Sequence, residues 1–400
     1  MSVNPYFLEF LSNIRLTKSQ LDDLITGHNT LRDRLTNDAD LSEIIVSTFL
    51  QGSYRRATAI KPKNGKRADV DIIVVTNLDR HTTTPEEALK LFIPFVEKHY
   101  KGKYRIQGRS IGIELSYVDL DIVITSAPSE ANKALLKSDS VTTALALEEL
   151  GSNWRLVSSW AEPSVQRNWT SLMVESVRAA AEWKTVSLYI PDQEANYWVE
   201  TNPLEQIRWT RDKNKNTNGH FVNVVKALKW WRVCKLTDLK YPKGYPIEHM
   251  IGDCCPSYIT SVAEGVVKTL EAIVSNYAWN RTNETTPVLA DRGVPSHNVW
   301  KRVSNEDFVA FYDHVVEAAA TARKAYEAEL MSEQVQLWRS LFGSEFPQMK
   351  EEDTRGERLA VKAKQLESGA ATIGGGINII KGTAGITVPR ERNHYDTGNL

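Results

Sequence analysis

Stretches of apolar and β-branched residues mark three strands in the first third of the chain. Residues 44–50 (IIVSTFL) form one stretch, and residues 69–75 (DVDIIVV) and 114–124 (ELSYVDLDIVI) form two more, each of which contains acidic residues before its apolar part. β-Branched residues are enriched in strands, and a short continuous apolar run is typical of a buried strand. We therefore expect a sheet in which acidic side chains precede buried apolar segments.

A period close to 3.6 residues predicts helices before and after these strands. Thr17, with Gln20 three residues later, has the spacing of a capping box, and leucines follow at helical spacing. Thr84, Pro85 and the two glutamates after them predict the start of a helix that extends to residue 99. Further helical patterns, the last three suited to a bundle, lie at residues 133–150, 203–212, 220–233, 259–278, 306–330 and 332–342.

The composition is that of an ordinary soluble protein. Of 400 residues, 42% are hydrophobic and 25% are charged, and the formal net charge is −1. A protein that must bind long nucleic acid usually carries a broad basic surface, which this charge balance does not indicate. No apolar run approaches the roughly 20 residues that span a bilayer, and no signal-peptide pattern begins the chain. Three cysteines without metal-ligand spacing favour reduced thiols, so we expect a cytoplasmic protein without membrane contact.

The segment after the first predicted strand has the features of a phosphate-binding turn. It reads Gln51-Gly52-Ser53-Tyr54, and glycine permits both a tight turn and a close approach of the backbone to a ligand. Ser53 can cap a helix that begins at Tyr54. Backbone N–H groups and a hydroxyl at such a helix start suit the β- and γ-phosphates of a nucleoside triphosphate. We therefore interpret Gln51, Gly52 and Ser53 as substrate-binding residues.

Acidic residues enter the next two predicted strands in pairs. Asp69 and Asp71 are two residues apart, so both carboxylates lie on one side of a strand. Two adjacent carboxylates are costly without a cation between them, and their hard oxygen ligands suit Mg²⁺. Two-metal phosphoryl transfer commonly uses a third carboxylate as well, and we choose Asp121 because it directly enters an apolar segment, as Asp71 does. The neighbouring Asp119 could instead support the site or face solvent.

The Gly-Ser turn, the Asp-x-Asp strand and a third aspartate opening a later strand together resemble the polymerase-β-like nucleotidyltransferases. Within them, the chain resembles the cGAS/DncV-like nucleotidyltransferases (CD-NTases) of the bacterial anti-phage system CBASS. The similarity is greatest to clade D and rests on residues 49–56 (FLQGSYRR), 67–71 (RADVD), 115–121 (LSYVDLD) and 225–232 (VKALKWWR). It implies a bilobal α/β (α+β) fold, in which a nucleotidyltransferase palm with a mixed sheet is joined to a second, helical lobe.

The chain divides into four parts under this interpretation. We expect an N-terminal helical spine at residues 1–40, the palm at residues 41–200 and the helical lobe at residues 201–345. Residues 346–400 change to a charged segment and then to a stretch rich in Gly, Ala and Ile, for which we expect a flexible tail. The resemblance permits conjugation of the C-terminus by a ubiquitin-transfer-like partner, which nothing in these residues requires.

The helical lobe adds further candidate substrate-binding residues. Asn223, Lys226 and Lys229 share one face of a predicted helix, where lysines could either hold a triphosphate or be ordinary surface residues. The resemblance favours the first alternative for Lys229, which matches the family's phosphate-binding lysine, and leaves Lys226 as a second candidate. Tyr245 matches an aromatic residue of the family and could stack on a purine, although Gly244 stands where the family has a serine.

The resemblance also implies a mechanism. Asp69, Asp71 and Asp121 would be catalytic and would bind two Mg²⁺ ions, with Mn²⁺ as an alternative. Asp69 and Asp71 would hold both ions, and Asp121 would complete the ion that lowers the pKa of the attacking hydroxyl. The substrates would be ATP and, as a further candidate, GTP or another NTP. Clade D implies an adenosine-rich cyclic trinucleotide, a second messenger read by an effector for which a nuclease is expected.

Two other functions stay open at this point. The same three aspartates could transfer a nucleotide to an RNA end, a protein or a small molecule without a template. The chain could also be a catalytically silent nucleotide-binding protein, although the presence of all three acids and of the Gly-Ser turn argues against this. The clade-like second lobe and the lack of global basicity favour self-contained synthesis of a cyclic product.

Overall fold

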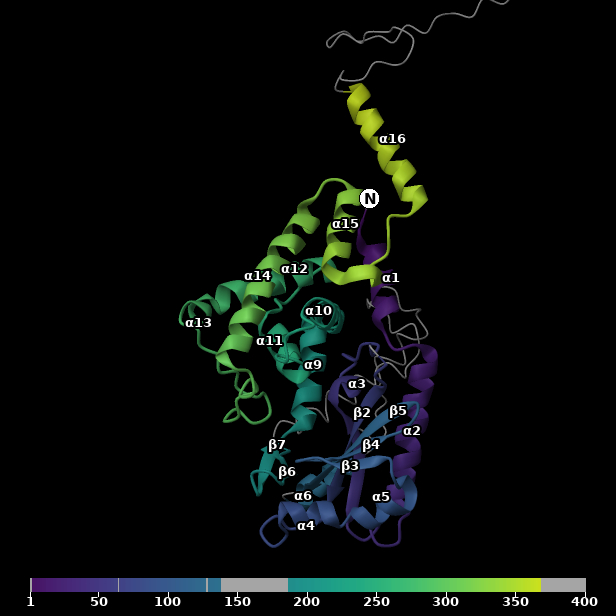
Figure 1. Cartoon of the computed structure of the whole chain (residues 1–400), viewed down its shortest axis with the longest axis vertical. Coiled ribbons are helices and arrows are strands. Elements are labelled where there is room, and N and C mark those ends of the chain that lie inside the picture. The colour runs from purple at the N-terminus through teal and green to yellow at the C-terminus, as the bar shows by residue number, and fades with distance from the viewer. Residues whose placement is uncertain (1, 64, 127–128, 138–185, 368–400) are drawn as a thin grey trace, which may run out of the picture.

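Figure 1 shows a computed structural model of the chain, in which residues 2–63, 65–126, 129–137 and 186–367 are described. A sheet with its covering helices forms one end of the molecule, and a group of helices forms the other end. The α+β fold predicted from the sequence, with a mixed sheet and a helical second lobe, is therefore confirmed. The helices are α1 (Asn4–Ile14), α2 (Lys18–Thr36), α3 (Gly52–Arg55), α4 (Pro85–Lys90), α5 (Ile93–Tyr100), α6 (Glu130–Leu136), α9 (Pro203–Asn216), α10 (Phe221–Lys235), α11 (Tyr245–Cys254), α12 (Val262–Asn276), α13 (Ala278–Thr282), α14 (Asn305–Glu327), α15 (Met331–Phe342) and α16 (Glu351–Glu367), with a 3₁₀ turn at Gly343–Glu345.

The sheet is mixed because its two central strands run parallel while the other described pairs are antiparallel. The strand order is β1-β2-β5-β4-β3, and β6 and β7 extend the sheet from β5. The strands are β1 (Ile45–Gln51), β2 (Ala68–Thr76), β3 (Tyr104–Ile106), β4 (Ile111–Glu114), β5 (Val118–Ser126), β6 (Leu188–Asp192) and β7 (Tyr197–Thr201). The first two predicted runs are confirmed as β1 and β2. The third, predicted at residues 114–124, is confirmed as β5 only from Val118, because Glu114 ends β4.

The two faces of the sheet pack against different apolar layers, because side chains alternate along a strand. Ile72 of β2 lies on the face that is covered by α2, α4 and α5. Ile73 lies on the opposite face, which packs against α6 and α9. Asp69 and Asp71 precede Ile73 by four and two positions, so they lie on the same face of the strand as Ile73. The acidic start of β2 therefore continues the side of the sheet whose apolar part is covered by α9.

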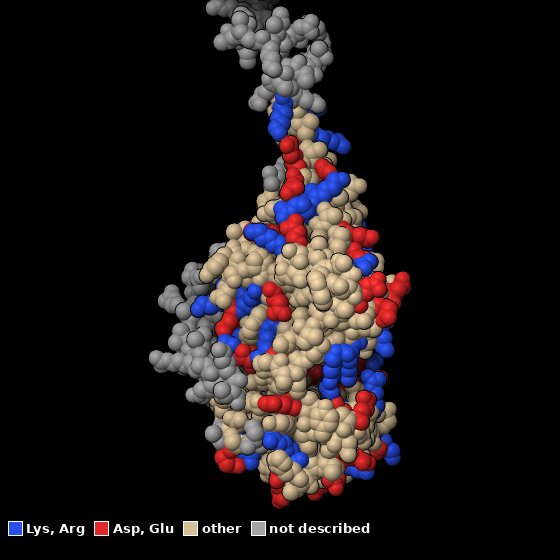
Figure 2. All heavy atoms as spheres, turned by 90° about the vertical axis from the view of Figure 1, so that its left-hand side faces the viewer, with Lys and Arg blue, Asp and Glu red and all other residues tan. Residues whose placement is uncertain are grey.

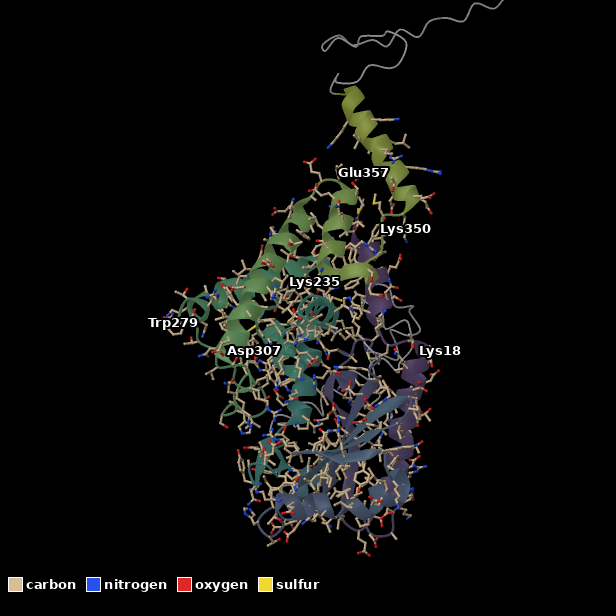
Figure 3. All side chains as sticks on the ribbon, viewed as in Figure 1. Lys18, Lys235, Trp279, Asp307, Lys350 and Glu357 are labelled. Carbon is tan, nitrogen blue, oxygen red and sulfur yellow. The ribbon has the colours of Figure 1, made fainter. Side chains whose placement is uncertain are left out.

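The helical end has a core of its own, to which α1, α10, α11, α12, α14 and α15 contribute. Aromatic rings join α1 to α15: Phe10 stacks on Phe342 with centroids 4.5 Å apart, and Phe7 meets Trp338 edge to face at 4.9 Å. The leucines of α2 instead pack on the sheet, and Lys18, where α2 begins, lies at the junction of the two ends (Figure 3). Residues 1–40 thus contribute one helix to each end of the molecule.

Two predicted helices differ from those observed. The helix expected from residue 84 to 99 is divided into α4 and α5, since Pro94 has no N–H to donate to residue 90 and its ring crowds that turn. In the segment predicted as one helix at residues 133–150, α6 ends at Leu136 and the remainder lies outside the described residues. The expected tail begins with α16, and residues 368–400 also lie outside the described part. The division into four domains stays a prediction.

Positive and negative charges are mixed on one face of the molecule. On the face drawn in Figure 2, Lys and Arg side chains are interspersed with Asp and Glu.

None of the helices in the described part of the chain combines the length and the apolar character that a membrane crossing requires. Cys234, Cys254 and Cys255 are free thiols.

Candidate active site

Three aspartates come together where the parallel strands begin. Asp69 and Asp71 lie on β2, and Asp121 lies on β5 directly opposite Asp71 in the register. Neighbouring strands are about 4.8 Å apart, and residues in register point to the same face. Parallel pairing of β2 with β5 therefore makes these carboxylates neighbours on the face that is shared with α9. The sequence separates Asp71 from Asp121 by 50 positions, and the pairing of the strands removes that separation.

Burial and mutual repulsion raise the pKa values of these carboxyl groups. Burial is the first cause for Asp71, and the charges of Asp69 and Asp121 add to it, so that its pKa rises to about 7. Burial also raises the pKa values of Asp69 and Asp121, and each of these two groups is raised further by neighbouring carboxylates. The side chain of Asp69 is nevertheless exposed to water. Such a group of acids favours a cation.

The donor chemistry of this group suits a hard divalent ion. Carboxylate oxygens are the ligands that Mg²⁺ and Mn²⁺ prefer, and a bound cation would relieve the repulsion that raises these pKa values. Within the described residues, no group of three or more His, Cys, Asp or Glu side chains is arranged so that it could hold a metal ion. The fit to a metal ion therefore rests on the type of donor and on the unbalanced charge.

Asp119, the alternative third carboxylate, already has a partner. Arg67 Nε lies 2.6 Å from Asp119 Oδ1, and Arg67 Nη2 lies 3.5 Å from Glu114 Oε2. In the register of the parallel strands Asp119 lies opposite Asp69, two pairs before Asp71 and Asp121. The ion pair with Arg67 supports the choice of Asp121 as the third catalytic carboxylate.

Gly52 brings the predicted phosphate-binding turn against the central aspartate. Its φ is +73°, and a Cβ placed on it would lie 1.9 Å from Asp71 Oδ2, so a side chain here would displace that carboxylate. Gln51 pairs with Asp71 across β1 and β2. The predicted capping role of Ser53 is wrong, because the chain already turns into α3 at Gly52 and Gln51 occupies the N-cap position. Ser53 is half-buried in the first turn of α3.

A buried ion cluster joins the sheet end to the helical end beside these acids. Lys229 of α10 donates from Nζ to the backbone oxygen of Thr58 at 2.9 Å and to Glu248 Oε1 at 2.8 Å. Arg56 donates from Nε and Nη2 to Glu248 Oε2, both at 3.2 Å. Burial alone would raise the pKa of Glu248, but the charges of Lys229 and Arg56 lower it overall. Lys229 also opposes the burial-driven rise in the pKa of Asp69, which places its charge next to the three aspartates.

The other two predicted substrate-binding residues differ in accessibility. Tyr245 begins α11 and is half-buried, and the Arg56 guanidinium carbon lies 5.0 Å from the centre of its ring. Lys226 lies one turn before Lys229 on α10 and is 0% exposed. A fully buried ammonium cannot contact a nucleotide in this conformation. The interpretation of Lys226 as a phosphate contact therefore has no support in the structure, and we leave it out of the proposed site.

Sequence reasoning missed two sets of contacts around the acids. Arg56 and Glu248 are 192 residues apart, and no local pattern predicts that they pair. Gln107 lies in the turn between β3 and β4 and donates from Nε2 to Asp121 Oδ1 at 3.2 Å. A polar residue in a turn carries no periodic signal, so only the folded sheet identifies Gln107.

Residues 1–128 match the family described as the Second Messenger Oligonucleotide or Dinucleotide Synthetase domain (SMODS). The chain is 50% identical over 357 residues to a cyclic AMP-AMP-GMP synthase of Enterobacter hormaechei subsp. hoffmannii, covering 87% of this chain and 92% of that protein. It is 30% identical over 353 residues to a cyclic AMP-AMP-AMP synthase of an Acinetobacter species, covering 87% and 86% of the two chains.

A solved structure agrees with this assignment at the level of the fold. The CD-NTase CdnG of Bradyrhizobium diazoefficiens, in complex with GTP, matches with a TM-score of 0.59 and 13% identity, over 90% of this chain and 96% of that chain. The predicted resemblance to CD-NTases is confirmed by the two synthases, whereas clade D stays a prediction. The chain belongs to the CD-NTase family, nucleotidyltransferases that synthesise cyclic oligonucleotide second messengers.

Proposed function

We propose that this enzyme makes an adenosine-rich cyclic trinucleotide from ATP, with GTP as a further substrate. The observation that carries the proposal is the meeting of Asp69, Asp71 and Asp121 on one face of the sheet, beside the charge of Lys229. The relatives at 50% and 30% identity are named as synthases of cyclic AMP-AMP-GMP and cyclic AMP-AMP-AMP. Both products contain three nucleotides and at least two adenosines, which supports a trinucleotide product here.

Residues around the acids would bind the nucleotide. An ammonium group has three protons to donate, and Lys229 uses two of them on Thr58 and Glu248, so one is left for a phosphate oxygen. The Ser53 hydroxyl follows the turn made by Gln51 and Gly52 and would bind the same triphosphate. The ring of Tyr245 would stack on a base, because an aromatic π-face accepts any base without requiring hydrogen bonds.

Asp69, Asp71 and Asp121 would hold two Mg²⁺ ions, for which Mn²⁺ can substitute. Held by these residues, the ions would supply Lewis acidity, which would favour ionisation of an attacking hydroxyl and offset the charge of the pyrophosphate that leaves. The three carboxylates act mainly as ligands, and Asp121 can in addition accept the proton of the hydroxyl. The Arg56–Glu248–Lys229 cluster holds the lysine in place beside them.

The product would serve as a second messenger in anti-phage defence, as the family assignment supports. We expect a cyclic-nucleotide-sensing nuclease as the effector, and the family resemblance permits a ubiquitin-transfer-like partner for the C-terminus. Residues 368–400, which such a partner would use, lie outside the described residues. A cytoplasmic location would bring the enzyme together with both its nucleotide substrates and this effector.

Incubation of the purified protein with the four NTPs and Mg²⁺, followed by phosphatase and mass spectrometry, tests the proposal. We expect a phosphatase-resistant cyclic trinucleotide that is absent for Asp69→Ala. Asp119→Ala should keep most of the activity, because Asp119 is paired with Arg67. Digestion with a 3′–5′-specific nuclease then reports the linkage. Labelled RNA or protein in a lysate without any cyclic product would contradict the proposal, as would nucleotide-dependent stabilisation without turnover.

A further inference from the structure

Gln107 contacts the third catalytic aspartate from a neighbouring strand pair. It lies in the turn that joins β3 to β4, and its Nε2 donates to Asp121 Oδ1 at 3.2 Å. β4 is the antiparallel neighbour of β5, so the amide reaches across β4 to reach this carboxylate. The hydrogen bond engages one carboxylate oxygen of Asp121 and leaves the second oxygen for a metal ion.

Gly112 provides the space through which the amide passes. It lies directly opposite Asp121 in the β4–β5 register. A Cβ placed on Gly112 would lie 2.4 Å from Gln107 Nε2 and 3.1 Å from Asp121 Oδ1. Gly112 is not one of the glycines with positive φ, so the backbone conformation does not explain why glycine stands here. The contact between Gln107 and Asp121 does explain it, because any side chain at 112 would separate the two groups.

The turn that carries Gln107 is held by contacts that do not involve the aspartates. Its own backbone closes with a hydrogen bond from Gln107 N to Ser110 O at 2.8 Å. The β6–β7 turn then fixes it from outside, since Arg109 Nε donates to Asp192 Oδ2 at 2.7 Å and Gln193 N donates to Gly108 O at 2.8 Å. Because these bonds set the position of the backbone at residue 107, the side chain can orient Asp121.

We propose that Gln107 is a positioning residue for nucleotidyl transfer, which holds the Asp121 carboxylate in its ligating orientation through the gap at Gly112. The inference rests on the proposed function, in which Asp121 is a metal ligand. An amide suits the task because it donates a hydrogen bond without adding charge, whereas Lys or Arg would compete with the metal for the carboxylate. A glutamate would accept only, and its charge would repel Asp121.

The test compares Gln107→Glu, Gln107→Ala and Gly112→Ala with the wild type and with Gln193→Glu. Gln193 is a matched control, since it is an exposed glutamine on the adjoining turn. Mn²⁺ affinity is measured by electron paramagnetic resonance in the presence of a non-hydrolysable ATP analogue, together with kcat, the KM for ATP and the melting temperature. Removing a residue that orients a metal ligand typically weakens metal affinity or activity by roughly 10- to 100-fold. We expect losses of that size in Mn²⁺ affinity and kcat for the three variants, with a KM for ATP within about twofold of wild type.

Three outcomes overturn the inference and are distinguishable. Wild-type Mn²⁺ affinity and kcat in Gln107→Glu and Gln107→Ala, with an inactive Asp121→Ala, would remove the positioning role and leave the proposed function intact. Equal losses of Mn²⁺ affinity and kcat in Gln193→Glu would show that added negative charge on these hairpins, and not the contact of Gln107 with Asp121, causes the effect. A fully active Asp121→Ala would overturn the proposed metal site itself. Gln107→Glu is nearly isosteric, so it keeps the test decisive if Gln107→Ala or Gly112→Ala does not fold.

Discussion

Lys229 Nζ lies 2.8 Å from Glu248 Oε1, so a buried carboxylate holds the lysine that stands beside the proposed catalytic acids. The same carboxylate accepts two hydrogen bonds from Arg56, which follows α3 at the sheet end of the molecule. Glu248 itself belongs to α11 at the helical end. One side chain therefore connects the two ends of the molecule at the edge of the site and orients a phosphate-binding candidate.

Replacing Glu248 with Ala should strongly destabilise the protein. Lys229 and Arg56 would become uncompensated charges in a buried setting, and breaking such a pair costs about 3–5 kcal/mol. The free energy of unfolding in urea measures this loss. Glu271→Ala is the control, because the Glu271–Arg323 pair is 38% and 37% exposed, and an exposed pair is worth about 0–1 kcal/mol. Equal losses for the two variants would contradict a structural role for the cluster.

Replacing Lys229 with Ala should raise the KM for ATP. A hydrogen bond to a charged group contributes about 1.5–3 kcal/mol, so we expect the KM to rise by roughly 10- to 100-fold. Steady-state synthesis with varied ATP measures it. Lys235→Ala is the control on the same helix, since Lys235 is exposed at the end of α10 (Figure 3). An unchanged KM in Lys229→Ala would exclude a contact between Lys229 and the triphosphate.

Replacing Gly52 with Ala should abolish most of the activity through displacement of Asp71. The added Cβ would lie 1.9 Å from Asp71 Oδ2, in addition to the strain of a residue with φ of +73°. Gly102→Ala isolates the strain, because Gly102 has φ of +71° and no heavy atom lies within 4 Å of the position that its Cβ would occupy. Strain alone costs about 1 kcal/mol, so Gly102→Ala should lose about that much stability and keep synthesis, whereas Gly52→Ala should lose more stability and most of its synthesis. Similar activities in the two variants would show that the contact with Asp71 is unimportant.

Metal-free protein should lose stability as the pH rises through neutrality. The pKa of Asp71 is about 7 in the folded protein, against an ordinary value of 3.8, so the folded state binds this proton more tightly than the unfolded state. The stability that this tighter proton binding contributes is fully present below the pKa of Asp71 in the unfolded state. It is lost as the pH rises through the pKa of Asp71 in the folded state. In EDTA we expect the melting temperature to fall between about pH 5 and pH 8, and Mg²⁺ to restore it at about pH 8.

Asp71→Asn serves as the control for this pH dependence. An amide does not titrate in this range, so the fall in melting temperature between the two pH values should be much smaller in the variant. The restoration by Mg²⁺ should weaken as well, because one carboxylate ligand is gone. A wild-type protein whose melting temperature in EDTA does not depend on Asp71 would contradict the raised pKa.

Local features of the chain were predictable because they depend on residues that are close in sequence. The capping box at Thr17 and Gln20 is present, as is the one that begins α4 at Thr84. The apolar runs predicted β1, β2 and β5, and the period of two residues predicted that Asp69 and Asp71 share a face. The prediction of one continuous helix from residue 84 to 99 was wrong for a reason that is also local. Pro94 has no N–H group, so it interrupts the hydrogen-bonding pattern of the helix.

The sequence by itself determined the strand character of residues 45–51, 68–76 and 118–126, the paired acids and the glycine turn, since backbone preference and side-chain alternation act over a few residues. Only the tertiary structure decided that β2 pairs in parallel with β5, which sets Asp121 opposite Asp71. It also decided that Lys226 is buried while Lys229 reaches Glu248, and that Gln107 contacts Asp121. These contacts join distant segments, and which side chains they bury or align depends on how whole elements pack together.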